Sequence, residues 1–163
     1  MISKDIFIAK LQNEVRIIKH LAAKATTPEL LSFRFSDSQR TTAQWLAYIG
    51  LVGIAGTKDI LHDDASWFET FMDDMDNFDI TTFESTIDAN LATMVSMIGQ
   101  ASDEKLNEEK TLFGRFTDTR AGHMFTVYNR HVAYKTQIFL QLKAAGLASL
   151  GTINLWWGMD ASQ

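Results

Sequence analysis

Cysteine is absent from this chain of 163 residues, which excludes disulfides, zinc–thiolate sites and a cysteine nucleophile. The absence is compatible with a reducing cytoplasm. The first residues, Met-Ile-Ser-Lys-Asp, carry an acid where a secretory signal needs a basic head, so a cytoplasmic location is expected. The most apolar stretch, residues 46–56, is about half the length that spans a bilayer, and no membrane partner is expected.

Basic residues are also scarce, and they form no run. The formal net charge of −5 and the pI near 5.3 argue against binding a nucleic-acid backbone, which requires a basic surface. With 46% hydrophobic and 21% charged residues, the composition is that of a folded domain. There is one proline, Pro28, and no Gly/Ser-rich linker, so residues 1–163 are expected to form a single domain.

Apolar residues recur at helical spacing in four long segments. These are residues 4–24, the segment after Arg40, residues 83–98 ended by Gly99, and residues 119–145 with Gly146 as a left-handed stop. Short helices are expected after Thr27, over 67–78 and after Ser102, an irregular or extended crossing over 112–118, and an extended C-terminal tail. The pattern predicts an all-α fold, a four-helix bundle.

Capping boxes mark several helix starts, since a hydroxyl and an amide or carboxylate three residues later can satisfy each other's free backbone donors. The pattern occurs three times, at Thr41 and Gln44, at Ser66 and Glu69, and at Thr81 and Glu84. Each precedes a segment of helical apolar spacing, so each predicts a helix start.

Two of the long segments carry a resemblance to a known family. The second reads Arg-Thr-Thr-Ala-Gln-Trp-Leu-Ala-Tyr-Ile-Gly over 40–50, and the fourth ends Gln-Ile-Phe-Leu-Gln-Leu-Lys-Ala-Ala-Gly over 137–146. They resemble the DinB superfamily of up-down-down-up four-helix bundles. Its better-known members are metal-dependent hydrolases or thiol transferases, often dimeric. The tail over 150–160 is similar to a branch of the superfamily whose activity is unassigned.

The family's metal site uses one histidine from the second long helix and two, four residues apart, from the fourth. The resemblance puts Tyr48, Arg130 and Tyr134 at these positions, and none is a normal ligand of a divalent cation. A shift of one residue brings in His131 but places Lys135 at the second position on the fourth helix. The sequence therefore predicts a bundle without the metal triad and with no cofactor.

Tyr48, Arg130 and Tyr134 are the foremost candidate site, in a cleft between the second and fourth long helices. A guanidinium and two phenols can clamp a small carboxylate or phosphate. The alternative is a structural cross-link in which the phenols and a carboxylate such as Glu14 satisfy Arg130. The structural interpretation is favoured because buried polar groups are normally paired whether or not they act.

His123 precedes Arg130 by seven residues and therefore shares its helical face. It could act as a general base, with an ordinary pKa near 6.5; the simpler interpretation is a polar group at a helix start. A metal-dependent hydrolase or thiol transferase and a structural or protein-interaction dimer stay open as alternative functions. Phosphate-loop, dinucleotide-binding and zinc-protease motifs are absent.

Two further features bear on partners. The resemblance implies a homodimer. The small residues on the second helix allow either a second subunit or a neighbouring helix of the bundle to approach closely. The tail tryptophans can similarly lie on their own protomer or reach across a dimer. These residues are Ala47, Gly50, Gly53, Gly56, Trp156 and Trp157. The eight carboxylates between residues 59 and 79 are interpreted as solvated charges, because their spacing lacks the loop glycine of a calcium site.

Overall fold

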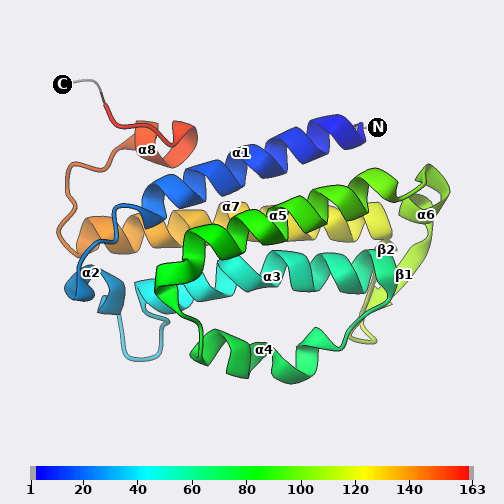
Figure 1. Cartoon of the computed structure of the whole chain (residues 1–163), viewed down its shortest axis with the longest axis horizontal. Helices are drawn as coiled ribbons and strands as arrows, with labels where there is room; N and C mark the ends of the chain where they lie inside the picture. Colours follow the sequence, from blue (N-terminus) through cyan, green and yellow to red (C-terminus); the bar gives the residue numbers. More distant parts are fainter. Residues whose placement is uncertain (1–2, 162–163) are drawn as a thin grey trace.

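The computed structural model describes residues 3–161, and its centre is a bundle of four long helices. These are α1 (Lys4–Ala22), α3 (Thr42–His62), α5 (Phe83–Gln100) and α7 (Arg120–Ala144). Figure 1 shows α1 and α7 running in one direction and α3 and α5 in the other. The all-α, up-down-down-up prediction is confirmed.

Short elements connect the long helices, and a last one, α8, follows α7 (Figure 1). They are α2 (Pro28–Ser32), α4 (Trp67–Asp76), the 3-10 helix η1 (Ile80–Thr82), α6 (Asp103–Asn107), β1 (Glu109–Leu112), β2 (Phe116–Thr119) and α8 (Thr152–Trp157). Helix α4 runs back along α3, which is why α3 and α5 can point the same way. Within residues 3–161, no helix is long and apolar enough to cross a membrane.

Only one of the three predicted capping boxes forms. Thr41 and Gln44 satisfy each other's backbone donors at the start of α3. The boxes at Ser66 and Thr81 do not form, because each hydroxyl donates to an aspartate two residues earlier, at 2.6 Å from Asp64 and 2.7 Å from Asp79. Such local side-chain bonds compete with helix capping. The helix start predicted at Ser66 is nevertheless correct, since α4 begins at the next residue. Gly99 also fails as a helix stop, because α5 continues through it to Gln100.

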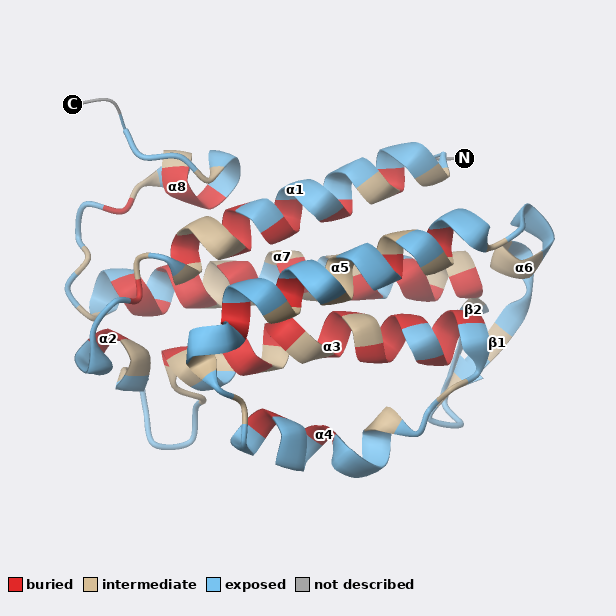
Figure 2. Cartoon of the chain, in the orientation of Figure 1, coloured by how far each residue is buried: buried red, intermediate tan, exposed pale blue. Residues whose placement is uncertain are grey.

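The apolar core has two large clusters separated by a polar layer, and a small third cluster of Val52, Ala55 and Phe71 between α3 and α4. One cluster lies toward α2 and includes Ile18, Ile49 and Ile138. The other lies toward the β-strands and includes Leu11 and Met124. Figure 2 shows that the buried positions concentrate on the inward faces of the long helices, while α4 is mostly exposed. The level between the two large clusters holds the buried side chains of Glu14, His131 and Lys135, while other buried polar groups, such as Thr42 and Gln141, lie elsewhere in the bundle.

The expected irregular crossing is in fact a β-hairpin. Strands β1 and β2 pair antiparallel, with Leu112 opposite Phe116. The turn places Phe113 at φ 53° and Gly114 at φ 63°. Two consecutive positive φ angles are typical of a type I′ turn, which matches the twist of a hairpin. Four-residue strands are too short to give a reliable sequence signal.

The C-terminal tail is helical where an extended segment was expected, and it packs on its own chain. Helix α8 lies against α1, and Arg16 donates 2.8 Å to the Trp157 carbonyl. Gly158 ends α8 at φ 53°, and a Cβ there would lie 3.0 Å from the Ile17 Cα. Glycine permits both this backbone angle and this close approach. The backbone of the tail thus packs on its own protomer, but Trp156 and Trp157 are 55% and 65% exposed, and a contact across a dimer stays a prediction.

The small-residue stripe of α3 faces the interior of the bundle. A Cβ on Gly50 would meet Phe83, one on Gly53 would meet His131, and one on Gly56 would meet Val127. All three glycines are buried against α5 and α7. Of the two interpretations, the structure supports close packing within the bundle, so the stripe gives no surface for a partner.

Candidate functional site

Helix α7 presents two adjacent polar faces. His131 and Lys135 lie on the fully buried face, whereas Arg130 and Tyr134 lie one residue earlier on a half-buried face. Each step along a helix turns the side chain by about 100°. The two faces therefore take part in different sites, an ion pair inside the bundle and a hollow near its surface.

The ion pair joins α7 to α1. Lys135 is completely buried, and its Nζ donates 2.5 Å to Oε2 of Glu14, which is 7% exposed. The ring of Trp156 in α8 lies over the ammonium, 5.2 Å from ring centroid to Nζ. The expectation that Glu14 satisfies Arg130 was wrong, because the partner of Glu14 is Lys135.

His131 completes the polar layer. Its Nδ1 lies 2.9 Å from the Val127 carbonyl and donates to it, since a carbonyl only accepts. Burial lowers the pKa of His131 below its ordinary value, so the ring is neutral near neutral pH. An added Cβ on Gly53 would stand 2.7 Å from the imidazole Cε1, so this helix position leaves space only for hydrogen. The layer is closely packed and structural in character.

On the half-buried face of α7, Tyr134 belongs to an aromatic cluster with residues of α3. Tyr48 of α3 and Tyr134 of α7 meet edge to face at 5.0 Å, and Tyr134 stacks on Trp45 at 4.8 Å. Burial raises the pKa of the Tyr48 phenol, and the neighbouring phenol adds to the rise. The Arg40 guanidinium covers the Tyr48 ring at 4.8 Å. The two predicted tyrosines thus lie together, in a packed cluster.

Arg130 and His123 line a small cavity further along α7, which we call the inner cavity. Its volume is about 20 Å³, room for roughly one water molecule. The two tyrosines are not among its lining residues, although the charge of Arg130 acts on the Tyr48 phenol. His123 is buried, and its Nε2 donates 2.8 Å to the Lys110 carbonyl. The structure therefore joins two of the predicted residues here and leaves the other two beside it.

Two donors at the inner cavity lack partners. Within residues 3–161, Arg130 makes no ion pair and no side-chain hydrogen bond, although it is half-buried. Trp67 also lines this cavity, and its buried indole nitrogen has no hydrogen-bond partner within residues 3–161. Buried donors are normally satisfied, and each exception calls for an explanation.

A larger hollow, which we call the outer cavity, adjoins the inner one. Its volume is about 340 Å³, and the two share Asp59, Trp67, Leu112 and Phe113 as lining residues. Its wall also includes Phe68 and Glu69 of α4. Because they share these lining residues, the two cavities adjoin, and we refer to them together as the hollow between α3, α4, α7 and the hairpin.

Asp59 does not add a free charge to this hollow. It was expected to be solvated, but it is only 9% exposed and lies 3.0 Å from Lys110. Lys110 also binds Asp63, which accepts two bonds from Arg120. The hydrogen bonds from Arg120 and Lys110 hold the pKa of Asp63 far below its usual range. These ion pairs connect the end of α3 to the hairpin, and the two carboxylates are neutralised by Lys110 and Arg120.

Phe113 occupies an unusual position for an aromatic residue. A positive φ is uncommon outside glycine, asparagine and aspartate, and costs roughly 1–2 kcal/mol for most residues. The Phe113 ring nevertheless lies on the wall of both cavities and contacts Phe68 at 5.7 Å between centroids. A strained residue at the wall of a hollow favours a functional interpretation.

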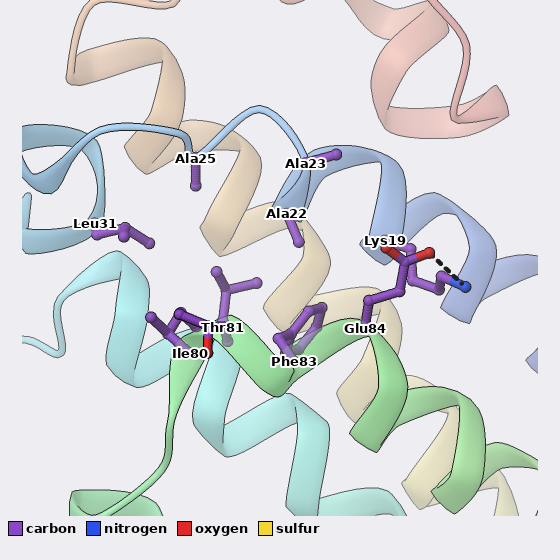
Figure 3. Close-up of a pocket in the computed structure, with 10 residues that line it drawn as sticks. Lys19, Ala22, Ala23, Ala25, Leu31, Ile80, Thr81, Phe83 and Glu84 are labelled. Atoms are coloured by element: carbon purple, nitrogen blue, oxygen red, sulfur yellow. Dashed lines mark ion pairs between the residues drawn. The ribbon is translucent and has the colours of Figure 1, made fainter.

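A separate pocket of about 270 Å³ opens at the other end of the bundle, between α1, α2 and α5 (Figure 3). Its wall is mostly apolar, with Leu31, Ile80 and Phe83. Its charged groups are already paired, since Lys19 binds Glu84 at 3.1 Å and Asp88 at 2.6 Å. With its charges paired, this pocket offers less for recognition than the hollow beside Arg130.

The family resemblance implies a metal, but the donor set does not fit one. A guanidinium and two phenols occupy the three implied ligand positions. Within residues 3–161, no three His, Cys, Asp or Glu side chains gather closely enough to hold a metal ion. An unneutralised guanidinium would also repel a dication.

Trp67, Phe113 and Glu69 were not predicted as site residues. They come from the crossover helix and the hairpin, which reach the hollow only through the tertiary fold. The Phe-Gly pair at 113–114 is a usable signal, because a type I′ turn favours Asn-Gly, and an aromatic residue in place of asparagine indicates a role for the ring.

Comparisons with known proteins identify the fold. Neither a family model nor a curated protein matches the chain. Among solved structures, the chain is similar to a DinB-like protein, YjoA, from Bacillus subtilis, with a TM-score of 0.71 and 16% identity over 89% of this chain and 94% of that one. At this identity the likeness concerns the fold alone, so the chemistry of the site depends on this chain's own residues.

Proposed function

We propose that this DinB-like bundle is a metal-free binding protein for a small anionic or polar ligand, held in the hollow beside Arg130. One observation supports the proposal: Arg130 and Trp67 line the same cavity, and within residues 3–161 neither the half-buried guanidinium nor the buried indole N–H has a hydrogen-bond partner. A carboxylate is a good complement to both donors, because it accepts charge-assisted hydrogen bonds at two oxygens.

The experiment is a titration of the purified chain with acetate, followed by the indole resonance of Trp67 in nitrogen–proton correlation spectra. We expect saturable shifts in the native chain and a loss of affinity of about tenfold or more in Arg130→Met, since one hydrogen bond to a charged group contributes roughly 1.5–3 kcal/mol. Arg115→Met is the matched control, because Arg115 is an exposed hairpin residue outside the cavity walls.

A purely structural role for Arg130 makes a different prediction. If Arg130→Met raised the free energy of unfolding and left acetate affinity unchanged, the guanidinium would be a replaceable part of the packing. Metal analysis of the purified chain tests the other part of the proposal. A stoichiometric, tightly held transition metal would favour the hydrolase or thiol transferase alternative.

A homodimer and a cytoplasmic location stay predictions from the sequence. Many of the large exposed apolar side chains lie on α4, the hairpin and the tail, among them Phe68 at 63%, Phe116 at 62% and Trp157 at 65%, and others lie on α1 and α7. Apolar groups gathered at a surface often mark protein contacts. Sedimentation of the purified chain at several concentrations distinguishes a dimer from a monomer.

A further inference from the structure

The two cavities of the hollow differ in charge. Arg130 lines the inner cavity and Glu69 lines the outer one. Within the described part of the chain, neither side chain takes part in an ion pair, whereas Asp59 on the shared wall is neutralised by Lys110. A ligand that reached both adjoining cavities would therefore meet a positive group in the inner one and a negative group in the outer one.

The outer cavity also has an aromatic wall. Trp67 and Phe68 meet edge to face at 5.6 Å, and Phe68 contacts Phe113 at 5.7 Å. All three rings line the same cavity, together with the carboxylate of Glu69. Aromatic faces beside a carboxylate attract cations, and alkylated ammonium groups in particular, because these shed water easily and need no hydrogen-bond acceptor.

The sizes of the two cavities match this division. The inner cavity, about 20 Å³, accepts a group no larger than one water molecule, such as a carboxylate oxygen. The outer cavity, about 340 Å³, accepts a bulky head group and lies in the range of small-molecule sites.

We propose that the hollow binds a zwitterion of the betaine class, with its carboxylate at Arg130 and the Trp67 indole and its alkylated ammonium against Phe68, Phe113 and Glu69. This inference rests on the proposed function, since it uses the same guanidinium, and it adds the class of ligand. It also gives a reason for Phe113, whose ring closes the aromatic wall from a strained backbone position.

The test compares four probes on the full chain by calorimetry and by the Trp67 indole resonance. The probes are acetate, tetramethylammonium, glycine betaine and the longer 4-(trimethylammonio)butanoate. We expect one of the two zwitterions to bind at least about tenfold more tightly than either acetate or tetramethylammonium, because it engages both ends of the hollow at once.

The variants separate the two ends. Arg130→Met and Glu69→Gln are each expected to weaken zwitterion binding, while Glu69→Gln leaves acetate binding unchanged. Phe113→Asn is expected to weaken the zwitterion by about 2- to 5-fold, the worth of one exposed cation–π contact. Asparagine suits a positive φ, so this variant should melt no lower than the native chain. Phe116→Leu is the control, as Phe116 lies in the same hairpin but lines neither cavity.

The outcomes distinguish the two proposals. If acetate binds as tightly as the zwitterions and Arg130→Met abolishes its binding, the betaine inference is overturned and the anion site stands. If no probe shifts the Trp67 indole, or if Arg130→Met changes no affinity, both proposals fail.

Discussion

Replacing the buried ammonium of Lys135 by an apolar group gives a decisive test of the bundle's polar layer. Methionine has nearly the same length as the lysine stem, so Lys135→Met removes the charge with little change in volume. Glu14, only 7% exposed, is then left without its cation. Breaking a buried ion pair from one side typically costs about 3–5 kcal/mol, because the remaining charge stays desolvated.

The second half of the test removes both charges. Glu14→Leu alone leaves a completely buried ammonium and is expected to cost a similar amount. The double variant Glu14→Leu/Lys135→Met leaves no unpaired charge, and we expect its free energy of unfolding to equal or exceed that of the native chain. Urea unfolding followed by circular dichroism measures the free energy of unfolding of the native chain, the two single variants and the double variant. In thermal unfolding, each lost kcal/mol lowers the melting temperature by roughly 2–4 °C in a chain of this size.

The reasoning fails if the two single effects simply add in the double variant. Additivity would mean that the side chains do not interact in solution, whatever their separation in the structure. Lys10→Met is the control for removing a lysine, since Lys10 is exposed on α1 and forms no ion pair within residues 3–161. We expect it to change stability by less than about 0.5 kcal/mol.

Three further predictions concern pH and the ends of the bundle. Because burial lowers the pKa of His131, its contribution to stability should be full above the ordinary value of 6.5 and fall by up to about 1.4 kcal/mol per pH unit below it. Urea unfolding of His131→Gln between pH 7.5 and 5.5 should show a smaller slope than the native chain, and the remaining slope is expected from His20, whose pKa burial also lowers. Asp63→Asn should lower the free energy of unfolding by about 1 kcal/mol at pH 7, a value reduced because the carboxylate is partly exposed to solvent. Arg120 depresses the pKa of Asp63, so the loss should become smaller as the pH falls below about 4 and the carboxylate is protonated. Urea unfolding at pH 7 and pH 3 measures the difference. Trp156→Ala removes the ring over the buried Lys135 ammonium and should lower the free energy of unfolding by about 1–2 kcal/mol. Trp157→Ala, at a 65% exposed position, should change the free energy of unfolding by less than about 0.5 kcal/mol. Equal effects of the two variants would contradict the contact between Trp156 and Lys135.

The long helices were predictable because their apolar residues repeat with the helical period over at least eighteen residues. The hairpin and α8 were not, because four to six residues are too few for a period to show. Helix α8 depends instead on the Asn154 side chain, which accepts 2.8 Å from the Gly151 backbone at its own start. Bonds of this kind become visible only in three dimensions.

The candidate site was predictable only in part, for the same reason. The seven-residue spacing put His123 and Arg130 on one face of α7, and both line the inner cavity. Sequence periodicity does not reveal which distant residues meet that face. Glu14 was assigned to Arg130 although it binds Lys135, and Trp67 was interpreted as packing although it lines the hollow. These pairings depend on how α1 and α4 dock against α7.

The close approach of Gly53 to His131 has an evolutionary consequence. The imidazole occupies the volume that any side chain at position 53 would need, so the two positions cannot change independently. Chains of common descent in which residue 53 has gained a methyl group should carry a smaller residue at 131, and the histidine should persist only beside glycine. The frequency of paired substitutions at positions 53 and 131 in homologous sequences therefore measures how strictly this contact is kept.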